Sequence, residues 1–373
     1  MAYVSQFSVP INGASTLPGR YYTAEDVFQM ELERIFYERW VCVGREEQIP
    51  KPGDYFTQTI GQESLIITRG QDAQVRAFYN VCRHRGTRIC TTSGGHFPQS
   101  IQCPYHAWTY GLDGQLIGAP HMNEVEGFEK ANYPLYTAAL DTWEGFLFVN
   151  LSRQPEPFTQ AFAPLIGKFS AWQMSKLRSA HRIAYDVQAN WKLLVENYSE
   201  CYHCPLIHPA LAKLSPYRSG QNDIYEGPFL GGFMDLNHDT GSLTMNGQTC
   251  GLPLGEVSGE DLSRVYYYSI FPSMLLSLHP DYVMFHTLWP QGVGRTYIVC
   301  EWLFDPEAMA QSDFDPTGAV GFWDMTNRQD WHVCELSQLG LVSRAYTPGP
   351  YSAAESLPAA FDQEVLRSLG QHS

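Results

Sequence analysis

Two pairs of cysteine and histidine in the first third of the chain have the residue types and the spacing of metal ligands. They are Cys82, His84, Cys103 and His106, so the first pair reads Cys-x-His and the second, after eighteen intervening residues, reads Cys-x-x-His. Four such ligands can hold one tetrahedral zinc ion. They can also hold a Rieske-type [2Fe-2S] cluster, in which both thiolates bind one iron and both imidazoles bind the other.

The distribution of these ligands over two loops favours the cluster. Each loop supplies one Cys and one His, so two equivalent loops can hold a two-metal cluster from opposite sides. Zinc sites more often pair Cys with Cys and His with His, and zinc remains the alternative. Cys90 and His96 lie in the same region without partners at this spacing. We expect Cys90 to be a small buried side chain and His96 an exposed loop residue.

A second possible metal site lies in the segment ECYHCPLIHP, which carries His203 and His208. Five residues on a regular helix turn through roughly 140°, so an unbroken helix would not direct both imidazoles at one ion. Pro205 and Pro209 interrupt the helical hydrogen bonds, so the chain between the histidines can turn toward a common point. We therefore expect His203 and His208 to bind the same metal ion.

Two neutral imidazoles and one carboxylate form the facial triad that binds ferrous iron and leaves positions open for O₂. The candidate carboxylates, Asp324 and Asp330, both lie in a late helical segment. Asp324 falls beside Arg328 on a charged face, where an ion pair is the common outcome. Asp330 falls on a mostly apolar stripe and is the predicted third ligand. The stripe comprises Val320, Trp323, Asn327, Asp330, Cys334 and Leu341.

Glu200 precedes His203 by three residues, so a helix would place both on one face. We expect its carboxylate to accept a hydrogen bond from this histidine and to be a candidate catalytic residue that links the two metal centres. The alternative is an ordinary helix glutamate in a solvated position.

The pattern of the sequence predicts an α+β protein in which a small antiparallel β domain precedes a helix-and-sheet domain. Short alternating runs separated by turn residues begin near residue 45 and end near 151. A proline-containing linker follows, and then aromatic and β-branched runs that predict a second antiparallel sheet. The expected domains are 1–44, a helical segment packing on the catalytic domain; 45–155, the cluster domain; and 156–373, the catalytic iron domain.

The spacing of apolar residues predicts helical structure in three segments, 24–40, 158–178 and 318–341. A loop and a short final helix are expected after them.

Length and composition limit the classes of function. The chain has 373 residues, 44% of them apolar, and a net charge of −15. This size exceeds a single small module, and the negative charge makes nucleic acid and anionic membranes poor partners. Neither a leader nor a long apolar stretch is evident, and nine cysteines are too few for a disulfide framework, so we expect a cytoplasmic location.

The chain resembles the α subunits of Rieske non-haem iron oxygenases over nearly its whole length. Their C-x-H…C-P-Y-H-x-W signature occurs from Cys82 to Trp108, and their Q-x-G-L pattern begins eight residues after Asp330. The segments ECYHCPLIHP and QDWHVCE are most similar to the choline, glycine betaine and carnitine oxygenase branch. In the family the position of Glu200 is acidic, usually Asp, and this branch shares Glu.

The resemblance implies a helix-grip catalytic fold and a homotrimer in which one subunit's cluster serves the next subunit's iron. It also implies a separate flavin and iron-sulfur reductase fed by NAD(P)H. The chain has no G-x-G-x-x-G after a strand, so a nicotinamide site of its own is not expected.

These observations predict a terminal oxygenase component that uses O₂ to hydroxylate or N-demethylate a quaternary amine. The alternatives are hydroxylation or cis-dihydroxylation of an aromatic substrate, and a Rieske electron carrier that is not an enzyme. Aromatic faces hold quaternary ammonium groups, and any one aromatic residue of the sheet is more often part of the core. The candidates are Tyr202, Phe233, Tyr266, Tyr267, Tyr268, Phe271, Phe285, Trp289 and Trp323.

Overall fold

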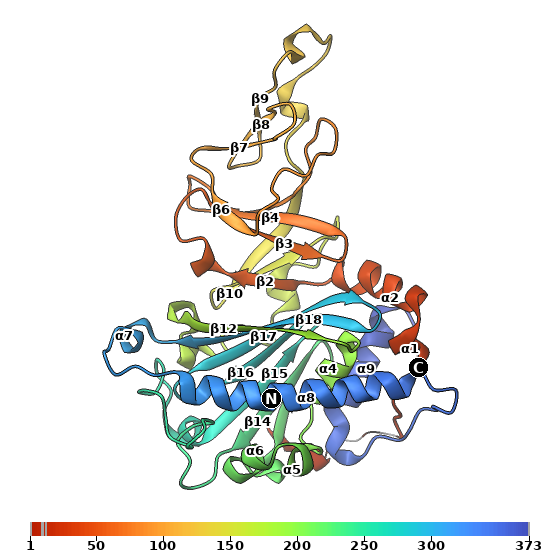
Figure 1. Cartoon of the computed structure of the whole chain (residues 1–373), viewed down its shortest axis with the longest axis vertical. Helices are drawn as coiled ribbons and strands as arrows, with labels where there is room; N and C mark the ends of the chain where they lie inside the picture. The colour runs from red at the N-terminus through yellow and green to blue at the C-terminus, as the bar shows by residue number, and fades with distance from the viewer. Residues whose placement is uncertain (1, 9–10, 12, 372–373) are drawn as a thin grey trace. The chain divides into compact units, whose positions relative to one another are not determined.

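The computed structural model describes residues 2–8, 11 and 13–371, and in it the chain forms two compact units (Figure 1). The smaller unit is Phe36–Ala161. The larger unit combines the residues up to Ile35 with those from Phe162 onward. The early helices and the iron-site sequence therefore belong to one unit, and the two Cys-His loops belong to the other.

The smaller unit is built from antiparallel strands, as the alternating sequence predicted. Its main sheet has the order β2-β11-β10-β5-β4-β3-β6, and a second sheet has the order β7-β8-β9. The strands are β2 (Val41–Arg45), β3 (Asp54–Ile60), β4 (Glu63–Arg69), β5 (Val75–Tyr79), β6 (Gly94–His96), β7 (Ser100–Gln102), β8 (Thr109–Gly111), β9 (Leu116–Gly118), β10 (Thr137–Trp143) and β11 (Phe146–Asn150).

The larger unit contains an eight-stranded antiparallel sheet of order β1-β13-β14-β15-β16-β17-β18-β12. Its central strands are the aromatic and β-branched runs that predicted a sheet, and all five residues of β16 are buried. The strands are β1 (Val4–Ser5), β12 (Arg178–Val187), β13 (Gln221–Ile224), β14 (Phe229–Asp235), β15 (Arg264–Ile270), β16 (Met274–Leu278), β17 (Val283–Gly292) and β18 (Arg295–Phe304).

In the larger unit, helix α4 packs on α8 and on α9, and all three helices contact the sheet (Figure 1). They are α4 (Trp191–Tyr198), α8 (Thr317–Leu341) and α9 (Ser356–Ser368). The long helix α8 buries Phe322, Trp323, Asn327, Trp331 and Cys334, which recur at helical spacing. The predicted α+β fold, an antiparallel β domain followed by a sheet with helices, is confirmed.

The early helices α1 (Arg20–Thr23) and α2 (Glu25–Glu31) are fixed to α4 through a buried ion pair. The Nζ of Lys192 lies 2.5 Å from the Glu31 carboxylate, and both side chains have no exposed surface. The indole N–H of Trp191 donates to the same carboxylate at 2.8 Å. A buried ion pair needs such additional hydrogen bonds to offset its lost hydration, and here they hold the start of α4 in place.

Two predicted helices differ in the structure. Residues 158–178 contain the short helix α3 (Phe158–Ala161), a series of turns and the first residue of β12, so the helical structure expected over this segment is mostly absent. Gly167 has a positive φ of 76°, which interrupts a helix, and Pro164 lies three residues before it. The helix predicted over 24–40 begins at the expected place, and α2 gives way to a π-helical turn at Leu32–Phe36.

No helix among the described residues is both long enough and apolar enough to cross a membrane.

Candidate metal centres and substrate cavity

The two Cys-His loops of the smaller unit have the same backbone conformation. In each loop the cysteine N–H donates to the carbonyl five residues later, from Cys82 to Thr87 and from Cys103 to Trp108, both at 2.8 Å. The residue four positions after each cysteine donates back to the cysteine carbonyl and has a positive φ, 71° at Gly86 and 55° at Ala107. Two equivalent loops are what a cluster held from opposite sides requires.

The cysteines of these loops are buried, whereas the histidines are only partly buried. Cys82 and Cys103 are 3% and 2% exposed. The hydroxyl of Tyr110 lies 3.3 Å from the Cys82 sulfur and also accepts the Arg83 N–H, so it is positioned to donate to the thiolate. The sequence did not point to Tyr110, because a tyrosine two residues after Trp108 has no chemical signal of its own.

His84 and His106 lie together at the tip of the loops. Their ring centroids are 4.7 Å apart, and His84 stacks on Trp108 at 4.8 Å. Burial, then the neighbouring His106 and Arg85, lower the pKa of His84, so the neutral imidazole that a metal requires is favoured. The two sulfurs and the two imidazoles thus form separate pairs, an arrangement that fits a two-iron cluster better than a single zinc ion.

Cys90 and His96, the other cysteine and histidine near these loops, have environments of their own. Cys90 is 7% exposed, and burial raises the pKa of its thiol to about 11. His96 lies at the surface with its Nδ1 2.9 Å from the Asp54 carboxylate. Cys90 is buried and His96 is exposed, as expected, but His96 ends strand β6 and does not lie in a loop.

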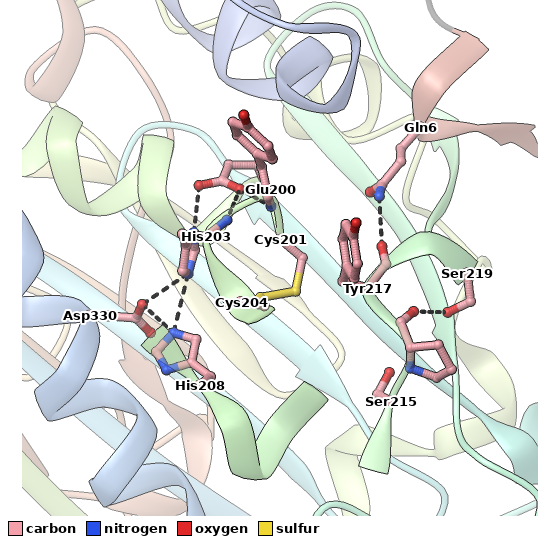
Figure 2. The surroundings of a disulfide bond; sticks show 12 residues. Gln6, Glu200, Cys201, His203, Cys204, His208, Ser215, Tyr217, Ser219 and Asp330 are labelled. Carbon is pink, nitrogen blue, oxygen red and sulfur yellow. Dashed lines mark hydrogen bonds and ion pairs between the residues drawn. A yellow bond between two sulfur atoms is a disulfide. The ribbon is translucent and has the colours of Figure 1, made fainter. Parts of the chain in front are cut away.

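In the larger unit, His203, His208 and Asp330 come together (Figure 2). His203 directly precedes the short helix α5 (Cys204–Ile207), and His208 lies between it and α6 (Pro209–Leu214). A proline lies in the first turn of each short helix, so the chain turns between the two imidazoles as the sequence predicted.

The three potential ligand atoms form a compact triangle. The Nε2 atoms of His203 and His208 are 3.2 Å apart, and Asp330 Oδ1 is 3.2 Å from the first and 2.8 Å from the second. Metal bonds of about 2.1 Å to adjacent corners of an octahedron place those corners about 3.0 Å apart. The triangle therefore matches one face of an octahedral iron site.

The outward nitrogen of each histidine is also bonded. Nδ1 of His203 lies 2.5 Å from Glu200 Oε1, and Nδ1 of His208 lies 2.8 Å from Gln329 Oε1. Such partners fix the tautomer that leaves Nε2 available to a metal. The sequence pointed to Glu200 and missed Gln329, for which the position next to Asp330 was the only signal.

The side chain of Glu200 is only 13% exposed, so the alternative of an ordinary solvated glutamate is not supported. Its own loop holds the carboxylate in place. It accepts hydrogen bonds from the backbone N–H groups of Tyr202 and His203. Burial alone would lower the pKa of His203, but its contacts with Asp330 and Glu200 raise that pKa to about 10. Burial alone would raise the pKa of Asp330, but the two histidines lower it, so the carboxylate is ionised and ready to bind a cation.

The other late carboxylate has a different environment. Asp324 lies 3.0 Å from the Arg328 guanidinium and accepts a hydrogen bond from the Tyr185 hydroxyl at 2.9 Å. It faces away from the histidine pair and forms the surface ion pair expected from its spacing.

Cys201 and Cys204 form a disulfide beside this site, a pairing that the sequence analysis did not anticipate (Figure 2). The bond closes the turn between Glu200 and His208, so it holds the segment that carries His203.

A cavity of about 750 Å³, including its open mouth, adjoins the three potential iron ligands. Its wall includes four aromatic rings and two carboxylates, and no Lys or Arg occurs among the described residues that line it. Of the aromatic candidates, Phe233, Tyr267 and Trp323 line the cavity, and the other six do not. Tyr198 lines it as well and was not predicted, because only the tertiary arrangement turns this end of α4 toward the sheet.

A second hollow, of about 1220 Å³ including its open mouth, is also lined by Glu200 and His203. Its wall includes Val333, Ser337 and Leu341 on α8, and Glu355 near the start of α9. Glu200 and His203 therefore lie between the two cavities.

Paired Cys-His loops in a β unit, together with two histidines and a carboxylate at a cavity in a helix-and-sheet unit, define a Rieske non-haem iron oxygenase. Comparison with known proteins gives the same class. Residues 39–129 match the Rieske [2Fe-2S] domain, and residues 174–371 match the ring hydroxylating alpha subunit (catalytic domain). The chain belongs to this family of oxygenase α subunits.

Several relatives are similar over most of the chain. The glycine betaine monooxygenase oxygenase subunit of Pseudomonas aeruginosa is 30% identical, with 96% of this chain and 91% of the relative covered. The carnitine monooxygenase oxygenase subunit of Acinetobacter baumannii is 39% identical over about half of each chain. The structure of the quaternary ammonium Rieske monooxygenase CntA with L-carnitine has a TM-score of 0.78 at 26% identity and covers both chains completely.

As a member of this family, the chain is an oxygenase component with a Rieske [2Fe-2S] cluster and a mononuclear iron. It acts on a small molecule with O₂ and electrons from a separate reductase. A simple Rieske electron carrier would lack the catalytic domain, so that alternative is not supported.

Proposed function

We propose that this chain hydroxylates or N-demethylates a small quaternary amine. The observation that carries the proposal is the cavity beside His203, His208 and Asp330, whose wall has aromatic rings, two carboxylates and, among the described residues, no Lys or Arg. A quaternary ammonium group cannot donate hydrogen bonds, and a desolvated cation over an aromatic face gains on the order of 2 kcal/mol. A cationic Lys or Arg in the same wall would repel it.

The roles of the residues follow from this proposal. Cys82, His84, Cys103 and His106 hold the cluster, and His203, His208 and Asp330 hold the iron. When bound, the iron supplies the activation of O₂ at its open positions.

The remaining wall orients the substrate. The rings of Tyr198, Phe233 and Trp323 hold the cation, so an N-methyl carbon or a neighbouring carbon can face the open side of the triad. Hydroxylation at an N-methyl carbon gives a carbinolamine that releases formaldehyde, whereas hydroxylation elsewhere leaves an alcohol or an aldehyde. The relatives named for glycine betaine and carnitine, and CntA with γ-butyrobetaine, support a substrate of this class.

We also propose a homotrimer in which Glu200 links the cluster of one subunit to the iron of the next. The carboxylate already accepts from His203 and lies beside the second hollow, from which a histidine of another chain can reach it. Leu336, Leu339 and Val342, at the end of α8, are more than half exposed, as residues of a protein interface would be in a separated subunit. Inter-subunit electron transfer is named for CntA.

The described residues up to Ile35 belong with the catalytic domain, Phe36–Ala161 carry the cluster, and the residues from Phe162 onward carry the iron, so the expected boundaries after residues 44 and 155 move to Ile35 and Ala161. The reductase contains flavin and an iron-sulfur centre and draws on NAD(P)H, and the cytoplasm provides that nucleotide.

The test is a substrate panel with the purified oxygenase, a generic reductase, NADH and O₂. Choline, glycine betaine, carnitine, proline betaine and simple aromatic acids are supplied one at a time, and organic product and formaldehyde are measured. NADH loss alone is not sufficient, because uncoupled reduction of O₂ also consumes it. We expect product from at least one quaternary amine. Conversion of an aromatic acid to a hydroxylated or dihydrodiol product, with every quaternary amine inert, would contradict the proposal.

A further inference from the structure

Three residues on neighbouring strands form a row in the wall of the substrate cavity. Asn222 of β13 is the partner of Gly232 of β14, and Gly232 is the partner of Tyr267 of β15. Directly opposed residues of antiparallel strands lie on the same face of a sheet. All three residues line the cavity.

The two outer residues of this row carry polar atoms that lack partners. Asn222 Nδ2 and the Tyr267 hydroxyl are shielded from solvent, and neither has a hydrogen-bond partner among the described residues. The hydroxyls of two nearby tyrosines are bonded, that of Tyr198 to Leu276 O and Ser277 Oγ, and that of Tyr268 to Asp223. An unpaired buried donor costs stability, so two of them in one row of a binding cavity mark a place where the acceptor of a ligand would be bound.

The middle residue, Gly232, is required by the close approach of β13. A Cβ there would lie 1.8 Å from the backbone oxygen of Gln221, so no larger residue fits between the two strands. Adjacent strands are about 4.8 Å apart, which separates the outer two backbones by roughly 10 Å. Gly232 therefore adds no side chain between the two neutral hydrogen-bond donors.

We propose that Tyr267 and Asn222 form a neutral subsite that binds the oxygen-bearing end of the substrate. The inference rests on the proposed function and names what that substrate needs besides its cation. Both side chains donate to an acceptor oxygen, and the described lining residues include no Lys or Arg that would bind it as an ion pair. The substrate class is a quaternary amine with a hydroxyl, carbonyl or carboxylate oxygen within a few bonds of the nitrogen.

The subsite is tested with Tyr267→Phe and Asn222→Leu in the metal-loaded protein. Both changes conserve shape, and neither removes an internal hydrogen bond, so neither should lower the melting temperature. The ligands are choline and n-propyltrimethylammonium, in which a methyl group replaces the hydroxyl. We expect the wild-type protein to bind choline at least tenfold more tightly than its isostere. Each variant should reduce that ratio by about tenfold, with a larger effect on KM than on kcat.

Tyr268→Phe is the matched control. Tyr268 is the next residue of β15 and faces the other side of the sheet, where its hydroxyl donates to Asp223 at 2.7 Å. This variant should lower the melting temperature and leave the ratio of affinities unchanged. An unchanged ratio in both Tyr267→Phe and Asn222→Leu would overturn the subsite while the wild-type protein still oxidised quaternary amines. If the wild-type protein bound neither ammonium ligand, the proposed function would fail and this inference with it.

Discussion

Gln329 is the residue through which the geometry of the iron site can be tested most quantitatively. Its Oε1 accepts the Nδ1–H of His208 at 2.8 Å, and His208 is only 2% exposed. Gln329→Leu removes that acceptor. Because the imidazole of His208 is buried, water cannot take the place of the lost acceptor. A buried donor left unpaired costs about 1–3 kcal/mol, and loss of such a partner typically weakens metal binding about 10- to 100-fold. The free-energy cost and the loss of metal affinity agree, because a tenfold change in a binding constant corresponds to about 1.4 kcal/mol.

The assay is anaerobic competition for ferrous iron between the protein and a calibrated chelator. We expect Gln329→Leu to bind the mononuclear iron about 10- to 100-fold more weakly while the Rieske spectrum is unchanged. Arg328→Leu is the control, since the neighbouring side chain is 63% exposed and pairs with Asp324 rather than with a histidine. Gln329→Glu retains an acceptor and should bind iron at least as tightly as the wild-type protein. Equal iron affinities of Gln329→Leu and the wild-type protein would refute the reasoning.

Five further substitutions test other parts of the structure. Asp330→Ala should remove one iron of three per chain and all oxygenation, whereas Asp324→Ala should retain both; iron analysis and product assays decide, and exchanged effects would show the helix-face argument to be wrong. Glu200→Gln should leave cluster reduction and iron content intact but lower turnover by an order of magnitude or more; an unchanged single-turnover rate would exclude a role in electron transfer. Tyr110→Phe should lower the reduction potential of an assembled cluster by removing a hydrogen bond to Cys82 sulfur, measured by a redox titration. Glu31→Ala leaves the buried Lys192 ammonium without its carboxylate and with Asn190 Oδ1 as its acceptor, so chemical denaturation should show a loss of about 3–5 kcal/mol, and a loss below about 1 kcal/mol would contradict that assignment.

The sequence was most informative where periodicity extended over many residues. Helix α8 is regular for 25 residues, so the 3.6-residue period correctly separated the side chains that face the sheet from those that face solvent. This is why Asp330 could be distinguished from Asp324 before their surroundings were known. The proline positions were equally informative, because they interrupt local hydrogen bonds wherever the rest of the chain lies.

The sequence was least informative where long-range contacts decide the local structure. The segment 158–178, expected to be helical, is mostly a series of turns. Its helix propensity is not sufficient to continue a helix through Pro164 and Gly167. Gln329 and Tyr110 gain their roles from partners more than 25 residues away. The row of Asn222 and Tyr267 exists only because β13, β14 and β15 pair in one register, which no spacing in the chain reveals.

A single-turnover experiment tests the central claim most directly. Insertion of one oxygen atom consumes two electrons besides O₂, and the fully reduced chain with both metal centres loaded carries two. The pre-reduced protein is mixed with O₂ and one substrate, without a reductase, and organic product is counted per chain. We predict up to one product molecule per chain from a quaternary amine, and none from the same substrate with Asp330→Ala. Product from an aromatic acid, with none from any quaternary amine, would contradict the account.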